Sequence, residues 1–383
     1  TVASGFWLPG MPGRFYSACV APGGSHPLIR MSTSRVQSDL SLETFARGLP
    51  KAELHVHLEG CLSPDLMFML ARRNGIALPW NDAQALAAQY RFQDLQSFLD
   101  LYFQGCKVLV TAQDFYDLTR QYLARAHADR VVRAEMFIGP QSFVAQGVPI
   151  EALMEGVLAA MADATAQDGI SAGLLVSVHR HRSQEDALRT LDSVAPWADR
   201  IAGIGMGGAE RPNPPSRFTD FFRAARAQGY KTTVHAGEEG PADYVRQALN
   251  LLQVDRLDHG NACLADPQLV RELADRRMGL TVCPVSNLAL KGVDSLAAHP
   301  LRAMLQAGLC ATINSDNPPY FDAYVNDNYV RCLRALALTR DELATLARNS
   351  LSACFVPDAD KVRLMARLDA YLASARADDD AQP

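Results

Sequence analysis

Short apolar runs alternate with longer amphipathic stretches over most of this chain. The apolar runs predict strands, because they are brief and are separated by segments whose apolar positions recur at helical spacing. Eight such runs lie at 52–56, 134–138, 172–178, 200–204, 231–234, 256–258, 279–282 and 309–313. Helices are predicted between them, for example at 64–74, 112–128, 150–167, 183–194, 218–228, 242–252, 267–277 and 301–307.

Eight strands, each followed by a helix, predict an α/β fold, a (β/α)₈ TIM barrel that forms one domain over residues 44–383. Segment 75–127 is longer than one crossover helix needs, which predicts a helical insertion after the first strand, and 339–375 predicts C-terminal helices. Residues 1–43 are rich in Gly, Pro and Ser and predict an irregular N-terminal extension. The alternative, a doubly wound sheet, would carry a Gly-rich phosphate loop after the first strand, and 58–60 is not such a loop.

Composition narrows the class of protein. Of 383 residues, 48% are hydrophobic and 21% charged, as in ordinary globular proteins. No apolar run approaches the roughly 18 residues of a membrane span, so no membrane association is expected. The net charge is −5 without a Lys/Arg block, so no nucleic acid partner is expected. Eight scattered cysteines without a CxxC pair predict reduced, buried thiols and a cytoplasmic protein.

Ionisable residues stand at the ends of four predicted strands. His55 and His57 end the first strand, and as residues i and i+2 they face the same side. His235, His259 and Asp316 end the fifth, sixth and eighth strands, where a barrel places its chemistry. Three imidazoles and one carboxylate suit a zinc ion that keeps a position open for water. This pattern favours a metal site over the alternative of structural core histidines.

The other histidines are given lesser roles. His179 and His181 form a second such pair just past the third strand, and we expect them to support the site or a substrate loop rather than bind metal. His26, His127 and His299 are interpreted as surface or loop residues.

Longer motifs follow in one order along residues 44–355. They are PKAELHVHLEG at 50–60, HAGEEG at 235–240, DHG at 258–260, CPVSN at 283–287 and NSDNP at 314–318. Together they closely resemble the adenosine/adenine deaminase family of metal-dependent hydrolases, in the amidohydrolase superfamily. Three segments are more similar to its adenine-deaminase branch, which acts on free bases: SPDLMF at 63–68, EEGP at 238–241 and YVNDN at 324–328.

The resemblance implies one Zn²⁺ per chain and a set of catalytic roles. The implied zinc ligands are His55, His57, His235 and Asp316. Glu238 would protonate N1 of a purine, His259 would orient the attacking water, and Asp316 would take part in proton transfer. The chemistry agrees, because protonation at N1 makes C6 open to attack, and Glu238 lies three residues after a ligand.

Substrate contacts are implied at three further positions. Gly208 would offer its backbone N–H to purine N3, and Glu59 would face the sugar side of the substrate. Asn317 stands where the family has the second acid of Asp-Asp-Pro, which bonds N7. An amide can donate to N7 or accept from N7–H, but it cannot share a proton. Residues 137–141 also depart from the usual pattern of the branch.

The predicted function is zinc-dependent hydrolytic deamination of a 6-aminopurine, adenine or an N6-modified adenine, to the 6-oxopurine and ammonia. One alternative is an adenosine or other adenine-nucleoside deaminase. A non-deaminating amidohydrolase is another, but many of these need a lysine after the fourth strand, and 204–206 has none. A catalytically silent purine-binding barrel would be expected to have lost a ligand or Glu238. The expected partner is a small-molecule purine, and the oligomeric state stays open.

Overall fold

This computed structural model describes residues 33–380 of the chain, with side chains described over 41–377. The chain divides into two units, Thr1–Asp39 and Leu40–Pro383. Helix α1 (Thr33–Gly48) occupies part of the expected irregular extension, so that expectation is wrong from Thr33 onward, and residues 1–32 lie outside the described part. Among the described side chains of α1, the buried apolar residues Phe45 and Ala46 lie in its last turn.

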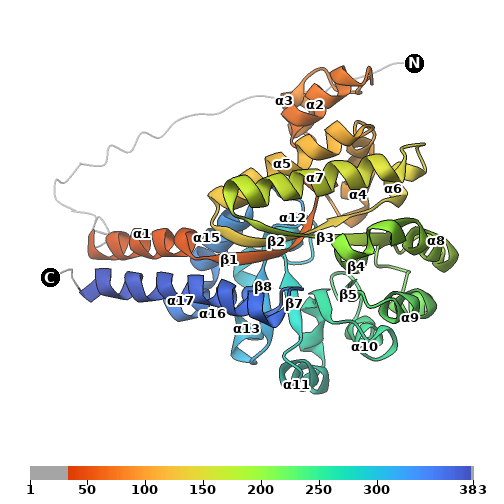
Figure 1. Cartoon of the computed structure of the whole chain (residues 1–383). Coiled ribbons are helices and arrows are strands. Elements are labelled where there is room, and N and C mark those ends of the chain that lie inside the picture. Colours follow the sequence, from red (N-terminus) through yellow and green to blue (C-terminus); the bar gives the residue numbers. More distant parts are fainter. Residues whose placement is uncertain (1–32, 381–383) are drawn as a thin grey trace, which may run out of the picture. The chain divides into compact units, whose positions relative to one another are not determined.

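The second unit contains a nearly closed barrel of eight parallel strands, as predicted. Each strand pairs with the next in chain order, and a bridge between Val56 and Asp316 joins the first strand to the segment after the last. Figure 1 shows the strands at the centre of this unit with helices around them. The strands are β1 Lys51–His57, β2 Val131–Ile138, β3 Ser171–His179, β4 Ile201–Gly207, β5 Lys231–Ala236, β6 Arg256–His259, β7 Gly279–Val282 and β8 Cys310–Ile313.

The predicted helices are present. Helix α2 begins at Pro64, where the predicted range 64–74 begins. The Ser63 hydroxyl caps it by accepting from the backbone N–H of Leu66 at 3.3 Å, and Pro64 takes the first helical position. The helices are α2 Pro64–Arg73, α3 Ala83–Ala87, α4 Leu95–Cys106, α5 Ala112–Ala128, α6 Gln141–Val144, α7 Ile150–Asp168, α8 Gln184–Val194, α9 Thr219–Ala227, α10 Ala242–Gln247, α11 Pro267–Asp275, α12 Pro284–Ala289, α13 Leu301–Gln306, α14 Pro318–Phe321, α15 Val325–Leu336, α16 Arg340–Ser352 and α17 Asp358–Asp380. The expected insertion after β1 is helical and includes α3 and α4.

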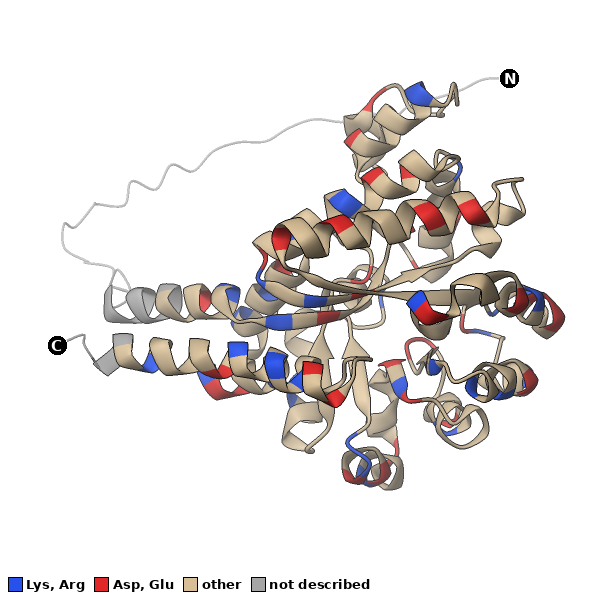
Figure 2. Ribbon diagram, in the orientation of Figure 1, with Lys and Arg blue, Asp and Glu red and all other residues tan. Residues whose placement is uncertain are grey.

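Charged residues of both signs are interspersed over the outer helices in Figure 2. Within the described residues, no helix combines the length and the apolar character that crossing a membrane requires. The seven cysteines of this part are all free and buried, as expected, and Cys19 lies outside it.

The barrel also buries charges near the beginnings of its strands, on the side opposite to the candidate site. Lys51 donates from Nζ to the backbone oxygen of Asp129 and to Asn326 Oδ1, both at 2.9 Å. The Arg256 guanidinium forms an ion pair with Glu135 at 2.6 Å. Both groups bond to neighbours at this end of the barrel, which leaves the carboxyl ends of the strands for chemistry.

Candidate active site

Strand β1 and the segment after β8 bring histidines and a carboxylate together. The backbone N–H of His57 donates to the backbone oxygen of Asp316 at 2.9 Å, and the backbone N–H of Asp316 donates to the backbone oxygen of His55 at 3.0 Å. Asp316 Oδ1 then lies 3.6 Å from His55 Nε2 and 3.4 Å from His57 Nε2. His235, at the end of β5, places its Nε2 3.2 Å from His57 Nε2.

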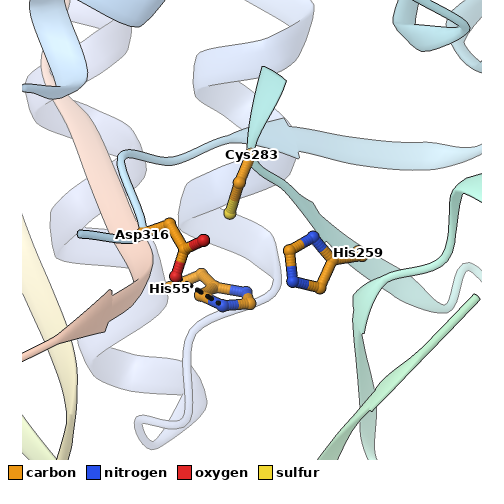
Figure 3. Close-up of side chains that lie close together, drawn as sticks. All are labelled: His55, His259, Cys283 and Asp316. Atoms are coloured by element: carbon orange, nitrogen blue, oxygen red, sulfur yellow. Dashed lines mark ion pairs between the residues drawn. The ribbon is translucent and has the colours of Figure 1, made fainter. Parts of the chain in front are cut away.

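The possible metal-ligating side chains here form two overlapping groups. Within each group, the ligand atoms lie within 4.8 Å of one another. One consists of His55, His57 and His235, and the other of His55, His259, Cys283 and Asp316. Figure 3 shows the second group, with its side chains turned toward one another.

The donor set fits a metal ion. His55 Nε2 is buried without a hydrogen-bond partner, although it faces other donor atoms. Burial, followed by the neighbouring His235, holds the pKa of His55 and of His57 well below the usual range. Both imidazoles are therefore neutral, which is the form that binds metal. Burial raises the pKa of the Cys283 thiol, so Cys283 stays protonated and is a poorer ligand.

Two threonines and an aspartate, to which the sequence analysis gave no role, surround the histidines. Thr281 Oγ1 lies 2.9 Å from His55 Nδ1 and donates to Asp258 Oδ1 at 2.9 Å. Thr233 Oγ1 donates to the same oxygen at 2.7 Å. Asp258 Oδ2 lies 3.3 Å from His235 Nδ1, outside hydrogen-bond geometry. Such partners orient imidazole rings toward a metal.

Glu238 and His259 lie side by side at the mouth of the barrel. Their nearest atoms, Glu238 Oε2 and His259 Nε2, are 3.5 Å apart. Burial, followed by the charge of Asp316, raises the pKa of Glu238 well above its usual range. A carboxyl that keeps its proton in this way can act as a general acid.

The loop that carries Glu238 is held by a second buried carboxylate, Glu210. Its two oxygens accept from the backbone N–H groups of Gly237, Glu239 and Gly240 at 2.7–2.8 Å. These three hydrogen bonds hold the loop that carries Glu238. The sequence analysis did not identify this residue, because its partners are backbone groups of another strand's loop.

A pocket opens beside these residues and includes the predicted substrate contacts. Glu59, in a short turn of helix at Glu59–Cys61, accepts from the backbone N–H of Gly139 at 2.6 Å through Oε1, while its Oε2 has no partner. Burial raises the pKa of Glu59 to about 7. Gly208 lines the pocket with φ +91°, which favours glycine. Asn317 also lines it.

The structure thus brings every predicted site residue to one place. Eight of them line the pocket, and His55 lies behind them, fully buried. The wall that the sequence analysis missed comes from α4, in the insertion. It consists of Leu95, Phe98, Leu99, Tyr102 and Phe103.

The remaining histidines differ in their surroundings. His179 lines the pocket, with Nε2 2.7 Å from Ser142 Oγ, and His181 stacks on it with ring centres 5.3 Å apart. His127 is exposed, as expected. His299 lies in a loop but is buried, with Nε2 3.1 Å from Asn287 Oδ1, so it is not a surface residue. His26 lies outside the described residues.

Known proteins are similar to this chain in sequence and in fold. The family model described as adenosine deaminase matches residues 50–371. An adenine deaminase of Rhodopseudomonas palustris is 60% identical over 332 residues, which cover 87% of this chain and 97% of that protein. One of Sphingopyxis alaskensis is 52% identical over 327 residues, 85% of this chain and 96% of that protein.

Solved structures agree. The crystal structure of adenine deaminase from Arthrobacter aurescens has a TM-score of 0.83 and 45% identity, covering 85% of this chain and 99% of that one. An amidohydrolase from Burkholderia ambifaria with bound Zn has a TM-score of 0.81 and 28% identity, covering 92% and 97%. Together with the family model, these relatives establish that this chain belongs to the adenosine deaminase family of metal-dependent hydrolases.

Proposed function

We propose that this protein deaminates adenine hydrolytically, giving hypoxanthine and ammonia. The observation that carries the proposal is the placement of a carboxyl of raised pKa, Glu238, in one pocket with neutral imidazoles and Asp316. The names of relatives that are 52% and 60% identical support adenine as the substrate.

One zinc ion is the proposed cofactor, held by His55, His57, His235 and Asp316. Three imidazole nitrogens and one carboxylate oxygen are donors that zinc favours. The related amidohydrolase with bound Zn supports this choice of metal. Zinc, when bound, lowers the pKa of water and so supplies the nucleophile at neutral pH.

The side chains of this chain then handle protons and orientation. Glu238 gives its proton to N1, which draws electron density from C6. A bond forms between C6 and the oxygen of water, and the bond between C6 and the amino nitrogen breaks. His259 and Asp316 are placed to take the first proton of the water and pass it to the leaving nitrogen, so that ammonia departs. The second proton of the water is released as C6–OH becomes C6=O and restores the proton that Glu238 gave to N1.

The pocket wall favours a free base over a nucleoside. Four of the five α4 residues in this wall, Leu95, Phe98, Leu99 and Phe103, contribute only carbon, and the fifth, Tyr102, carries one hydroxyl. Most of this wall therefore has no partner for the hydroxyls of a ribose. We propose a cytoplasmic location as well, since seven buried free cysteines are typical of proteins from reducing compartments.

The test is ammonia release from adenine, N6-methyladenine and adenosine by the zinc-loaded protein. We expect the highest kcat/KM on adenine, with Glu238→Gln as the inactive control. If adenosine is deaminated faster than adenine, the nucleoside alternative replaces this proposal.

A further inference from the structure

A buried histidine outside the metal cluster, His299, accepts a hydrogen bond from the protein backbone. The backbone N–H of Leu301, at the start of α13, donates to His299 Nδ1 at 3.1 Å. A backbone N–H can only donate, so Nδ1 carries a lone pair. Burial also lowers the pKa of His299 to about 4, which keeps the ring neutral. A neutral imidazole carries one N–H, and in His299 that proton is therefore on Nε2.

This proton fixes the amide of Asn287, which lies on α12 in the CPVSN motif. His299 Nε2 is 3.1 Å from Asn287 Oδ1, and Asn261 Nδ2 donates to the same oxygen at 2.8 Å. With the Asn287 amide reversed, its NH₂ group would face the N–H of His299, and two donors do not bond. Asn287 therefore keeps its oxygen toward His299 and its NH₂ group on the other side.

The NH₂ group of Asn287 faces His259. Asn287 Nδ2 lies 3.5 Å from His259 Nδ1, and both side chains are buried, as is that of His299. Because the amide donates there, His259 Nδ1 accepts, and the ring proton of His259 lies on Nε2. An imidazolium, with a second proton on Nδ1, would meet the same donor. Nε2 is the nitrogen that lies 3.5 Å from Glu238 Oε2, so the N–H of His259 faces the proposed acid.

We propose that Asn287 and His299 are positioning residues that hold His259 in its Nε2–H tautomer. The inference rests on the proposed function, which places His259 beside the attacking water. In this tautomer His259 offers a hydrogen-bond donor to the oxygen that attacks C6, while its lone pair is turned toward Asn287. Of the two groups placed to take the first proton of the water, His259 then only donates, which leaves the acceptance to Asp316.

NMR of the zinc-loaded enzyme with ¹⁵N in its histidine rings tests the inference directly. A ring nitrogen with a proton and one with a lone pair give separate ¹⁵N signals, and couplings to the carbon-bound ring protons distinguish Nδ1 from Nε2. Comparison with His259→Gln assigns the signals of His259. We expect the proton on Nε2 in the wild type. Asn287→Asp keeps the shape but turns an acceptor toward Nδ1, so we expect a proton on Nδ1 and a kcat on adenine at least about tenfold lower.

His299→Phe and His299→Gln form a matched pair, because both fill the space and only Gln can donate to Asn287 Oδ1. We expect a mixture of His259 tautomers and a kcat about tenfold lower in His299→Phe, at unchanged zinc content. His299→Gln should largely restore both the single tautomer and kcat. Equal losses of kcat in the two variants, with an unchanged spectrum of His259, would mean that His299 acts through stability alone and would overturn the inference.

The wild-type spectrum decides even where a variant does not fold. A proton on His259 Nδ1, with Nε2 free, in a wild type that deaminates adenine overturns the inference and leaves the proposed function intact. A proton on Nε2 in a wild type that does not deaminate adenine supports the tautomer assignment, and the proposed function fails alone.

Discussion

At this site, burial favours the neutral form of both the proposed acid and the proposed metal ligands. His57 and Glu238 have opposite ionisation chemistry, yet desolvation disfavours the charged form of both. It lowers the pKa of His57 and raises that of Glu238. One dry pocket therefore yields a neutral imidazole that can bind metal and a protonated acid that can donate.

Replacing Glu238 by Gln separates binding from chemistry. The amide fills the same space but has no acidic proton for N1, so we expect kcat on adenine to fall by about 10²–10⁴-fold. Zinc content and the affinity for a purine product should stay close to wild type in metal analysis and calorimetry. A kcat near the wild-type value would show that another group protonates N1.

His235→Ala tests the ligand set. Removal of one of four donors should take the zinc content from about one ion per chain to near zero after dialysis, measured by elemental analysis. The exposed His127→Ala is the matched control and should keep its metal. Two ions per chain in the wild type, or full zinc in His235→Ala, would contradict the assignment.

The sequence predicted the residues with a metal-binding chemistry but not those that orient them. His55 and His235 stand out because imidazoles at strand ends have few structural uses. Thr281 and Thr233 do not, since threonine is common in any strand and only the paired strands reveal that both reach Asp258. The departure at Asn317 was visible, but its orientation depends on contacts with Asp316 and Gly60.

At the scale of elements, all eight strands were predictable because a parallel barrel buries both faces of each strand and so requires continuous apolar runs. The role of α4 was not. Its apolar stripe indicates a buried face, but nothing in its spacing distinguishes a face that packs on the core from one that closes a pocket.

The start of α4 offers a test of that role. Asp94 caps the helix, accepting from the backbone N–H of Ser97 at 2.8 Å, and its loss should cost about 1 kcal/mol of helix stability. A frayed first turn displaces Leu95 and Phe98, so Asp94→Ala should raise KM for adenine several-fold with little change in kcat.

The control for this cap is Asp82→Ala. Asp82 caps α3 by accepting from the backbone N–H of Ala85 at 2.7 Å, and no residue of α3 lines the pocket. Steady-state kinetics should show an unchanged KM. Equal effects of both substitutions would mean that α4 acts through general stability and not as a wall.

At the scale of the whole molecule, the buried lysine at the start of β1 makes stability depend on pH. Burial lowers the pKa of Lys51 from 10.5 to about 7. Below pH 7 the amine is charged in both states, and the folded state bears the full cost of its burial. Between pH 7 and 10.5 only the unfolded chain keeps the proton, so stability rises with pH.

Lys51→Met should remove this dependence. The free energy of unfolding of the wild type, measured in urea, should rise relative to the variant by up to about 1.4 kcal/mol per pH unit over that window. The exposed Lys107→Met serves as control and should track the wild type. Parallel curves for the wild type and Lys51→Met would contradict the prediction.

The seam between the first strand and the segment after the last also orders events during translation. Contacts across it, such as that from Leu54 to Asn314, join residues 260 positions apart. A nascent chain carries His55 and His57 early but lacks Asp316 until nearly the whole barrel has been synthesised. Closing so long a loop is entropically costly and slow. An incomplete chain on the ribosome therefore has no finished metal site, and metal retention reports that the ring has closed.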